Sequence, residues 1–244
     1  MTIKKVLNEI KKGDYEYVDM RFTDPRGKLQ HVTVMASEVD EGFLKSGWMF
    51  DGSSIAGWKS INESDMKLMP DLDSGYLDPF YSEKTYCLHC NVVEPETGKL
   101  YGRDPRSTAV KAEEYLKKTK IGTKAYFGPE AEFFLFDDVK FSNSMNKVSF
   151  EVDAMDASWN TDTSYEMGNM GHRPGVKGGY FPVNPTDAGQ DIRSEMLSTM
   201  KRMGMKVDKH HHEVASCQHE LGLVFDALKT QGDNLQKYKY VIQN

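Results

Sequence analysis

Glu130 and Glu132 are residues whose type and spacing suggest chemistry. They lie in the segment 127–137, FGPEAEFFLFD, which predicts a strand because Phe and Leu crowd into it behind a Gly-Pro pair. Alternate side chains of a strand share one face. The two carboxylates would therefore point the same way, about 6–7 Å apart, on a face that Phe134 and Phe136 continue as core. Carboxylates on a half-buried face need a positive partner. A solvated strand end, or an Arg or Lys side chain, would also satisfy them, so the pair alone leaves its role open.

Two further glutamates extend this acidic set. Glu213 ends one predicted strand and Glu220 begins the next, with a tight connection between them. If these strands neighbour the segment 127–137, four carboxylates converge, and such a cluster selects Mg²⁺ or Mn²⁺, ions that usually bridge to phosphate oxygens. The alternative to a metal site is that these four glutamates are solvated charges on the surface. The triplet His210–His212 suggests zinc instead, but on a strand His211 faces away from its two neighbours, so the three imidazoles cannot ligate together.

The composition narrows the class of protein. The 244 residues carry a net charge of −6, with 39% hydrophobic and 28% charged residues and a mean hydropathy of −0.61. The negative charge, without a basic arm, argues against a nucleic-acid partner held through its phosphates. No apolar run reaches membrane-spanning length and no secretory signal is visible, so we expect a cytoplasmic protein that binds no membrane. Cys87 and Cys90 lie three residues apart in a strand-like run, which favours buried thiols over a zinc or redox pair.

Hydrophobic periodicity and turn signals predict the elements that must position these residues. Besides the acidic segment, the expected strands are 17–23, 30–35, 66–69, 85–93 and a hairpin of 139–141 with 148–152. The expected helices are 1–10, one capped by Ser37 that runs through residue 45, 105–118 behind Asp104, one capped by Asp187 that carries Ile192 to Met203, and 233–242 opened by Asp233. Residues 49–58 and 153–186 are predicted to be loops, the second of them functional. We place a domain boundary after Asp104, which gives a β-rich domain 1–104 and a second domain 105–244.

Six separated motifs resemble the signatures of bacterial type I glutamine synthetase. They follow one another along the whole chain: Phe50-Asp-Gly-Ser-Ser-Ile-Ala-Gly-Trp58, Asn62-Glu-Ser-Asp-Met66, Arg103-Asp-Pro-Arg106, Phe127-Gly-Pro-Glu-Ala-Glu-Phe-Phe-Leu135, Lys177-Gly-Gly-Tyr-Phe-Pro182, and His211-His-Glu-Val-Ala215 with Gln218-x-Glu220. The resemblance implies an α+β fold. An N-terminal β-grasp domain would be followed by the first part of a catalytic domain, in which a curved antiparallel sheet carries helices on its outside.

The resemblance also implies roles for the acidic residues. Glu132, Glu213 and Glu220 match the ligands of the metal that holds glutamate and phosphate. Glu130 matches one ligand of a second metal, which binds the phosphates of ATP. Tyr180, together with Glu213, matches residues that line the ammonium site.

Other positions match residues that bind substrates. Asp51 and Ser54 match a loop that reaches into a neighbouring subunit's active site, where the aspartate helps to bind and deprotonate ammonium. Asp208 and Phe225 match positions that contact the nucleotide, with the ring of Phe225 against adenine. Without the resemblance, Asp51 is equally typical of a turn, Tyr180 and Phe225 of core aromatics, and Asp208 of an exposed strand.

The implied activity is glutamine synthesis. ATP phosphorylates the γ-carboxylate of glutamate, and ammonium, after losing a proton, displaces phosphate from the γ-glutamyl phosphate. The implied cofactors are Mg²⁺ or Mn²⁺, two or more per site, with ATP as a substrate, and the implied assembly is a homo-oligomer, a dodecamer of two stacked hexamers.

The match also departs from the family pattern. Family members are longer, and the sequence ends before the segments that supply the second metal's histidine and the arginines that bind glutamate. Asn184 and Cys217 differ locally from the common residues. We therefore expect a truncated ligase that is inactive by itself. The alternative is a non-catalytic interaction or regulatory protein that kept the fold.

Overall fold

The computed structural model describes residues 1–160, 164, 166 and 172–244, so part of the predicted loop 153–186 lies outside the described residues. It divides into two compact units, residues 1–127 with 202–204 and 225–244, and residues 128–201 with 205–224. The domain boundary expected after residue 104 stays a prediction.

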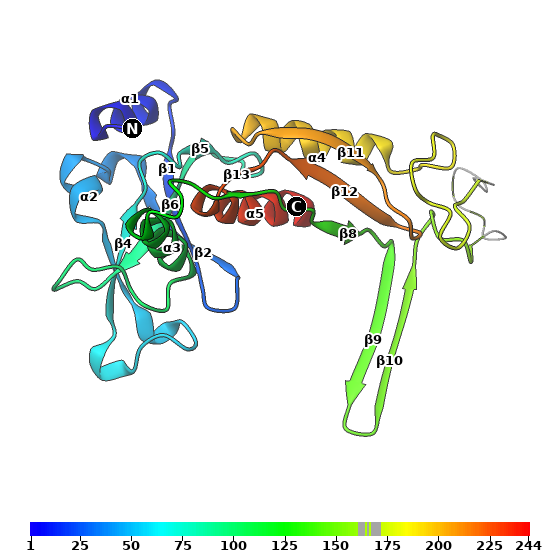
Figure 1. Cartoon of the computed structure of the whole chain (residues 1–244), viewed down its shortest axis with the longest axis horizontal. Helices are drawn as coiled ribbons and strands as arrows, with labels where there is room; N and C mark the ends of the chain where they lie inside the picture. Colours follow the sequence, from blue (N-terminus) through cyan, green and yellow to red (C-terminus); the bar gives the residue numbers. More distant parts are fainter. Residues whose placement is uncertain (161–163, 165, 167–171) are drawn as a thin grey trace. The chain divides into compact units, whose positions relative to one another are not determined.

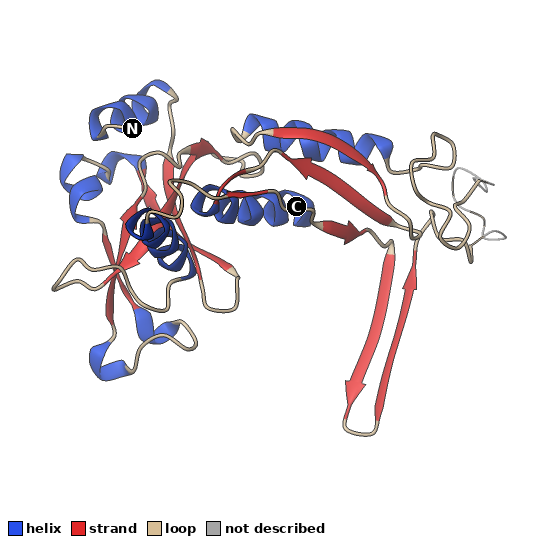
Figure 2. Cartoon of the chain, in the orientation of Figure 1, coloured by secondary structure: helices blue, strands red, loops and turns tan. Residues whose placement is uncertain are grey.

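Figures 1 and 2 show the elements, which are α1 (Ile3–Lys12), β1 (Tyr17–Thr23), β2 (Leu29–Met35), α2 (Glu41–Ser46), β3 (Trp48–Asp51), β4 (Asp65–Pro70), β5 (Tyr76–Leu77), β6 (Thr85–Val93), α3 (Pro105–Thr119), β7 (Tyr126–Phe127), β8 (Glu132–Phe134), β9 (Asp138–Ser144), β10 (Lys147–Asp153), α4 (Gln190–Arg202), β11 (Val207–His212), β12 (Gln218–Leu223), β13 (Asp226–Ala227) and α5 (Leu228–Gln243), with short 3₁₀ turns at Ala36–Glu38, Gly52–Ser54 and Ile61–Glu63.

The first unit is built on a mixed six-stranded sheet. Its strand order is β2-β1-β6-β4-β3, with β5 also paired to β6. β1 pairs antiparallel with β2 from Tyr17 opposite Met35 to Thr23 opposite Leu29, which confirms the hairpin that the turn 24–27 predicts. β1 and β6 run parallel, and the remaining pairs are antiparallel. This sheet and its helices have the α+β character expected from the sequence. In the described part of the chain, no helix is long and apolar enough to cross a membrane.

Both faces of β1 are buried, but they differ in chemistry. Met20 lies in a hydrophobic cluster on the apolar face, as the alternation of the sequence predicts. Asp19 and Arg21 lie on the opposite face and are equally buried. Arg21 donates from Nε to Asp19 at 2.7 Å and from Nη2 to Asp78 at 2.5 Å, so its charge is compensated. The Tyr240 hydroxyl of α5 donates to Asp78 at 2.9 Å, and α5 therefore covers this polar face.

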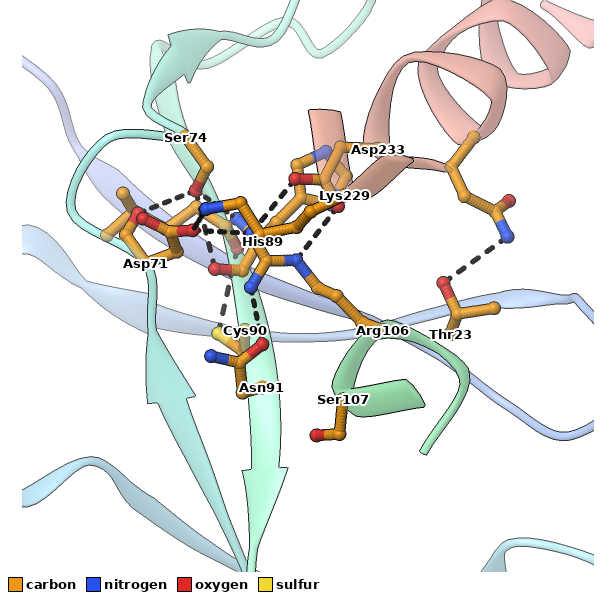
Figure 3. A network of polar contacts seen from close by, with 12 residues as sticks. Thr23, Asp71, Ser74, His89, Cys90, Asn91, Arg106, Ser107, Lys229 and Asp233 are labelled. Carbon is orange, nitrogen blue, oxygen red and sulfur yellow. Dashed lines mark hydrogen bonds and ion pairs between the residues drawn. The ribbon is translucent and has the colours of Figure 1, made fainter. Parts of the chain in front are cut away.

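Arg106, in the first turn of α3, joins three distant parts of the first unit (Figure 3). Its Nε donates to Asp233 of α5 at 2.8 Å and its Nη1 to Asn91 of β6 at 2.5 Å. Its Nη2 donates to Asp71 at 2.5 Å and to the second oxygen of Asp233 at 2.9 Å. This side chain is only 5% exposed, so the first unit depends on a buried polar network in addition to its apolar core.

The second unit contains a three-stranded antiparallel sheet, β11-β12-β8, and most of α4. Arg193 of α4 is fully buried, pairs with Asp187, and donates to the ring nitrogens of His210 at 3.3 Å and His219 at 2.9 Å. These contacts place α4 against one face of the sheet. An antiparallel sheet with a helix on its outside agrees with the expectation for this part of the chain.

β9 and β10 form a separate two-stranded sheet, which confirms the predicted hairpin (Figure 1). Phe141 lies opposite Phe150, and the two side chains are 80% and 79% exposed. Val148 is 75% exposed and Met145, at the tip, is fully exposed. Within the described residues, the hairpin therefore presents an apolar surface to solvent.

The strand predicted over 127–137 is interrupted. β7 ends at Phe127 and pairs with β13, whereas β8 begins at Glu132 and pairs with β12, so the two halves belong to different sheets. Phe134 and Phe136 stack on each other but are 48% and 37% exposed, so the aromatic core expected on this face is wrong for this unit.

Three predicted helix starts are also wrong. The last helix begins at Leu228, so Asp233 lies within the helix, where it accepts from the Arg106 guanidinium and does not cap the helix. The second helix begins at Glu41, where Asp40 accepts from the Phe43 amide at 2.7 Å; Ser37 lies in a 3₁₀ turn before it. α4 begins at Gln190, three residues beyond Asp187. The loop predicted over 49–58 begins with the last residues of β3.

Candidate metal centre

One cross-strand row of the second unit carries the chemically active side chains. His211 of β11 lies opposite Glu220 of β12, and Glu220 lies opposite Glu132 of β8. Residues directly opposite one another on neighbouring strands project from the same face. Glu213 follows two residues after His211, so alternation brings it to that face too. One imidazole and three carboxylates thus share one side of the sheet.

Three members of this row form a compact group. Ligand atoms of His211, Glu213 and Glu220 all lie within 4.8 Å of one another. His211 Nδ1 is 3.4 Å from a Glu213 oxygen, and its Nε2 is 3.6 Å from a Glu220 oxygen. The glutamate side chains are only 10% and 8% exposed. Donors bound to one divalent ion at roughly 2.0–2.6 Å stand about 3–4 Å from each other, so this group fits a divalent cation.

The electrostatics of this face favour a cation. Burial raises the pKa of Glu220; Lys209 and His211 lower it, and the carboxylates of Glu213 and Glu130 raise it, so that the net pKa is raised. Lys209 supplies one positive charge, 3.7 Å from a Glu220 oxygen. A divalent cation between these acids would stabilise their ionised forms further.

Gln218 ties Glu132 to the turn that carries Glu213. Its Nε2 donates to Glu132 at 2.5 Å, and its side-chain oxygen accepts from the Ala215 amide at 3.0 Å. The Glu213 amide donates to the Gln218 carbonyl at 2.8 Å. Glu132 itself is exposed and stands outside the compact group. The structure therefore brings together two of the three glutamates that the sequence predicts for one ion, with Glu132 beside them in the row.

A glycine segment packs against the same turn. A Cβ at Gly179 would stand 2.5 Å from the Glu213 carbonyl oxygen, so a larger residue cannot fit without displacing that backbone. Tyr180 follows, and its ring stacks on Phe181 with centroids 4.0 Å apart. The Tyr180 and Phe181 rings meet His211 edge-on at 5.7 and 4.6 Å. The structure thus places Tyr180 beside the compact group.

His212 anchors the turn from the other side of β11. This fully buried ring lies 2.9 Å from Asp156 through Nε2 and 2.6 Å from the Glu213 carbonyl through Nδ1. Burial lowers the pKa of His212, but the hydrogen bonds with Asp156 and the Glu213 backbone and the charge of Asp156 together outweigh it, so the pKa is raised. Asp156 also accepts from the Cys217 amide at 2.6 Å. His210 instead lies 3.0 Å from the Ser194 hydroxyl of α4, so the three imidazoles do not converge, as predicted.

Glu130 and Asp208 are two further predicted site residues of the second unit. Glu130 precedes β8 in irregular chain, close enough to Glu220 to raise its pKa. Asp208 is exposed on β11, and its carboxylate lies against Gly222, where a Cβ would collide with it.

Asp51, Ser54 and Phe225 belong to the first unit. Asp51 accepts from the Ser53 amide at 2.8 Å and from the Ser54 hydroxyl at 3.1 Å, so its carboxylate organises its own loop. Hydrogen bonds from Ser53 lower the pKa of Asp51. Phe225 is 60% exposed and packs edge-on against Tyr126 at 5.4 Å.

His211 is the member of the compact group that the sequence reasoning missed. The alternation of the triplet excludes three imidazoles on one ion, but it does not exclude His211 as a single ligand. The available signal was the alternation of His211 with Glu213, which places one imidazole on the acidic face.

Comparison with known protein families covers nearly the whole chain. Residues 14–95 match the family described as glutamine synthetase, beta-grasp domain, and residues 102–244 match glutamine synthetase, catalytic domain. Among curated proteins, the glutamine synthetases of Cereibacter sphaeroides and Rhodobacter capsulatus are each 67% identical over 242 residues. These alignments cover 99% of this chain but 52% and 55% of the relatives. The chain thus spans about half the length of the curated relatives it matches.

Solved structures give the same result for the fold. A cryo-EM structure of Plasmodium falciparum glutamine synthetase matches 99% of this chain and 48% of its own, with a TM-score of 0.88 at 26% identity. A GmaS–ADP complex matches with a TM-score of 0.72 at 18% identity, which shows the shared fold alone. The α+β fold with an N-terminal β-grasp domain is thereby confirmed.

Proposed function

This chain belongs to the glutamine synthetase family, and on that premise we propose that the whole protein is an ATP-dependent ligase that makes glutamine from glutamate and ammonium. A carboxylate is a poor electrophile, so the γ-carboxylate must first be phosphorylated, and ammonia then displaces phosphate from γ-glutamyl phosphate. The proposal includes ATP as a substrate and Mg²⁺ or Mn²⁺ as the cofactor.

The observation that carries the proposal is the compact group of His211, Glu213 and Glu220. Glu213 and Glu220 each offer a carboxylate oxygen to one divalent cation, with His211 or Glu132 as the next donor in the row. Glu130 is the proposed ligand of a second cation. Cations held by these carboxylates would supply positive charge to the phosphate oxygens of ATP.

Substrate roles for the remaining residues rest on position and chemistry. Tyr180 and Glu213 flank His211 and offer an aromatic ring and a carboxylate to ammonium, whose proton the carboxylate can accept. Asp51 and Ser54 are proposed to serve the site of a neighbouring copy. Exposed Phe225 suits stacking against adenine, and Asp208 suits a polar contact with the same nucleotide.

The proposed partner in assembly is a second copy of this chain. The β9–β10 hairpin exposes Phe141, Phe150 and Val148, which lie on a two-stranded sheet with no further strand among the described residues. Exposed apolar surface of this kind marks an interaction site, and a hairpin can pair edge to edge with its own symmetry mate. A dodecamer of stacked hexamers is the specific form we propose. The division into domains at 104/105 and a cytoplasmic location are further parts of the proposal.

Manganese binding tests the site directly. Isothermal titration with Mn²⁺ compares the wild type with Glu213→Gln and Glu220→Gln, and with Glu195→Gln on the exposed face of α4 as the matched control. We expect each of the first two substitutions to weaken Mn²⁺ by at least tenfold and the control to leave it unchanged. His211→Ala and Glu132→Gln, run in parallel, identify the third ligand by which of them weakens Mn²⁺ more. Equal affinity for the wild type and for Glu213→Gln and Glu220→Gln would reject the metal centre.

Catalysis is tested on the complete gene product by ATP-dependent release of glutamine from glutamate and ammonium. Absence of glutamine formation by the complete gene product would instead favour the non-catalytic alternative, against which tight binding of ATP with Mn²⁺ would count.

A further inference from the structure

A cavity of about 450 Å³ opens in the first unit between the β1–β2 turn and the last two turns of α5. Its walls come from residues 26–31 of the turn and β2, from Tyr81, and from α5 residues that include Gln236, Lys239 and Tyr240. Protein pockets that bury small molecules are of this size. The proposed metal residues Glu213 and Glu220 are not among its lining residues.

The lining is strongly basic in a chain whose net charge is −6. Arg21, Arg26, Lys28 and Lys239 line it together with His31, and none of the lining residues is Asp or Glu. Arg21 is compensated by Asp19 and Asp78 behind the cavity. In the described part of the chain, no carboxylate oxygen is paired within 4.0 Å with the other three basic side chains, although the charge of Arg26 helps to lower the pKa of nearby Asp24.

The turn that carries two of these charges is held rigidly. Asp24 accepts from the backbone amides of Arg26 at 2.9 Å and Lys28 at 3.0 Å, so its own carboxylate lies inside the turn. The Gly27 carbonyl accepts from Gln236 and from Lys239, each at 3.0 Å, and these bonds join the turn to α5. Gly27 has a φ of +79°, which suits glycine at this sharp reversal. These hydrogen bonds therefore fix the backbone positions from which the Arg26 and Lys28 side chains extend.

His31 and two tyrosines complete the walls. Asp19 lies 2.7 Å from His31 Nδ1, which orients the ring and leaves Nε2 for a ligand. Tyr81 and Tyr240 add flat aromatic surface. Guanidinium and ammonium groups beside an imidazole bind oxyanions through charge-assisted hydrogen bonds, and an arginine fork does so through two parallel bonds.

We propose that this cavity, the basic cavity, is a binding site for a small molecule with two or more negative charges carried by phosphate or carboxylate groups. The site shares no lining residue with the proposed metal centre, and it does not rest on the proposed function. Arg26, Lys28 and Lys239 bind the oxyanion, His31 adds a further donor, and the tyrosines contact the rest of the ligand.

Isothermal titration of the complete protein, freed of metal on a chelating resin, tests the site with pyrophosphate and with citrate as probes. Sodium chloride holds the ionic strength constant, because screening weakens any exposed ion contact. We expect saturable binding of at least one probe, and the probe that binds identifies the ligand as phosphate-like or carboxylate-like. Heats no larger than those of added chloride for both probes would overturn the proposal.

Variants locate the binding. The double substitution Arg26→Ala, Lys28→Ala should weaken the probe at least tenfold, and Lys239→Gln should weaken it severalfold. Lys11→Ala, on exposed α1, is the matched control and should change the affinity less than twofold. Glu220→Gln should leave the affinity unchanged, which separates this site from the metal centre. Unaltered binding by both cavity variants, with their thermal unfolding unchanged, would place the anion elsewhere and reject the assignment.

Discussion

Replacing Arg106 by methionine removes the charge at the centre of the buried network and keeps much of its volume. The Arg106 side chain is 5% exposed, and the carboxylates of Asp71 and Asp233 are each 14% exposed. Asp71 retains Lys229 at 2.6 Å, but Asp233 loses the two hydrogen bonds that its oxygens receive. Breaking one partner of a buried pair costs about 3–5 kcal/mol, because the other charge stays buried without compensation. We expect a loss in the free energy of unfolding near the lower end of that range.

Urea denaturation measures this loss through tryptophan fluorescence, in a Trp48→Phe, Trp159→Phe background that leaves buried Trp58 as the reporter of the first unit. Lys118→Met, on the exposed surface of the same helix, is the control and should change the stability by less than about 0.5 kcal/mol. The double variant Arg106→Met, Asp233→Asn removes the stranded charge and should recover a large part of the loss. A loss below about 1 kcal/mol for Arg106→Met, or no recovery in the double variant, would refute the argument from uncompensated charge.

Three further outcomes follow from the same physical reasoning. Burial lowers the pKa of His89 from 6.5 to about 4. Between these pH values the unfolded chain binds a proton that the folded chain does not, so the free energy of unfolding should fall by about 3 kcal/mol as the pH drops through this range. Urea titrations at several pH values should show that His89→Gln flattens this slope. Gly179→Ala should cost about 1–3 kcal/mol, since its Cβ would meet the Glu213 carbonyl at 2.5 Å, and should also weaken Mn²⁺ in titration; unchanged values for both would disprove the close packing. Phe141→Ser with Phe150→Ser should reduce the assembled mass in analytical ultracentrifugation and leave the unfolding of the first unit unchanged; an unaltered mass would exclude the hairpin from the interface.

The sequence predicts β1, β2, β4 and β6 of the first sheet because each is a short apolar segment bounded by turn residues, but it misses β3 and β5. β1 spans residues 17–23 and β6 residues 85–93, as expected from the pattern, and the turn 24–27 joins β1 to β2. Each of these strands has one continuous apolar face, and that signal is local.

Structural features that depend on residues far apart in the sequence could not be predicted from local sequence patterns. The acidic segment 127–137 looks like one strand, but its two ends pair with different strands, β13 and β12. Asp233 resembles a helix cap, yet a guanidinium from the start of α3 stabilises it inside the helix. The buried Asp19 and Arg21 likewise have no sequence signal, because alternation alone would place them in water.

The candidate site was predictable in its residue types but not in its grouping. Two glutamates of the predicted set, Glu213 and Glu220, meet in the structure. The third position of the compact group is filled by His211, because the register of β11 against β12 sets it opposite Glu220. Register is a property of paired strands, so a single sequence does not reveal which of two alternating residues will face a given partner.

The covering of the polar face by α5 has a consequence for synthesis on the ribosome. β1 and β6 emerge long before α5, so the nascent sheet must wait with one side open. That side carries Asp19, Arg21 and Asp78, charged groups that water solvates well until the helix covers them. When α5 is added, it covers this charged face, and its Tyr240 hydroxyl donates to Asp78.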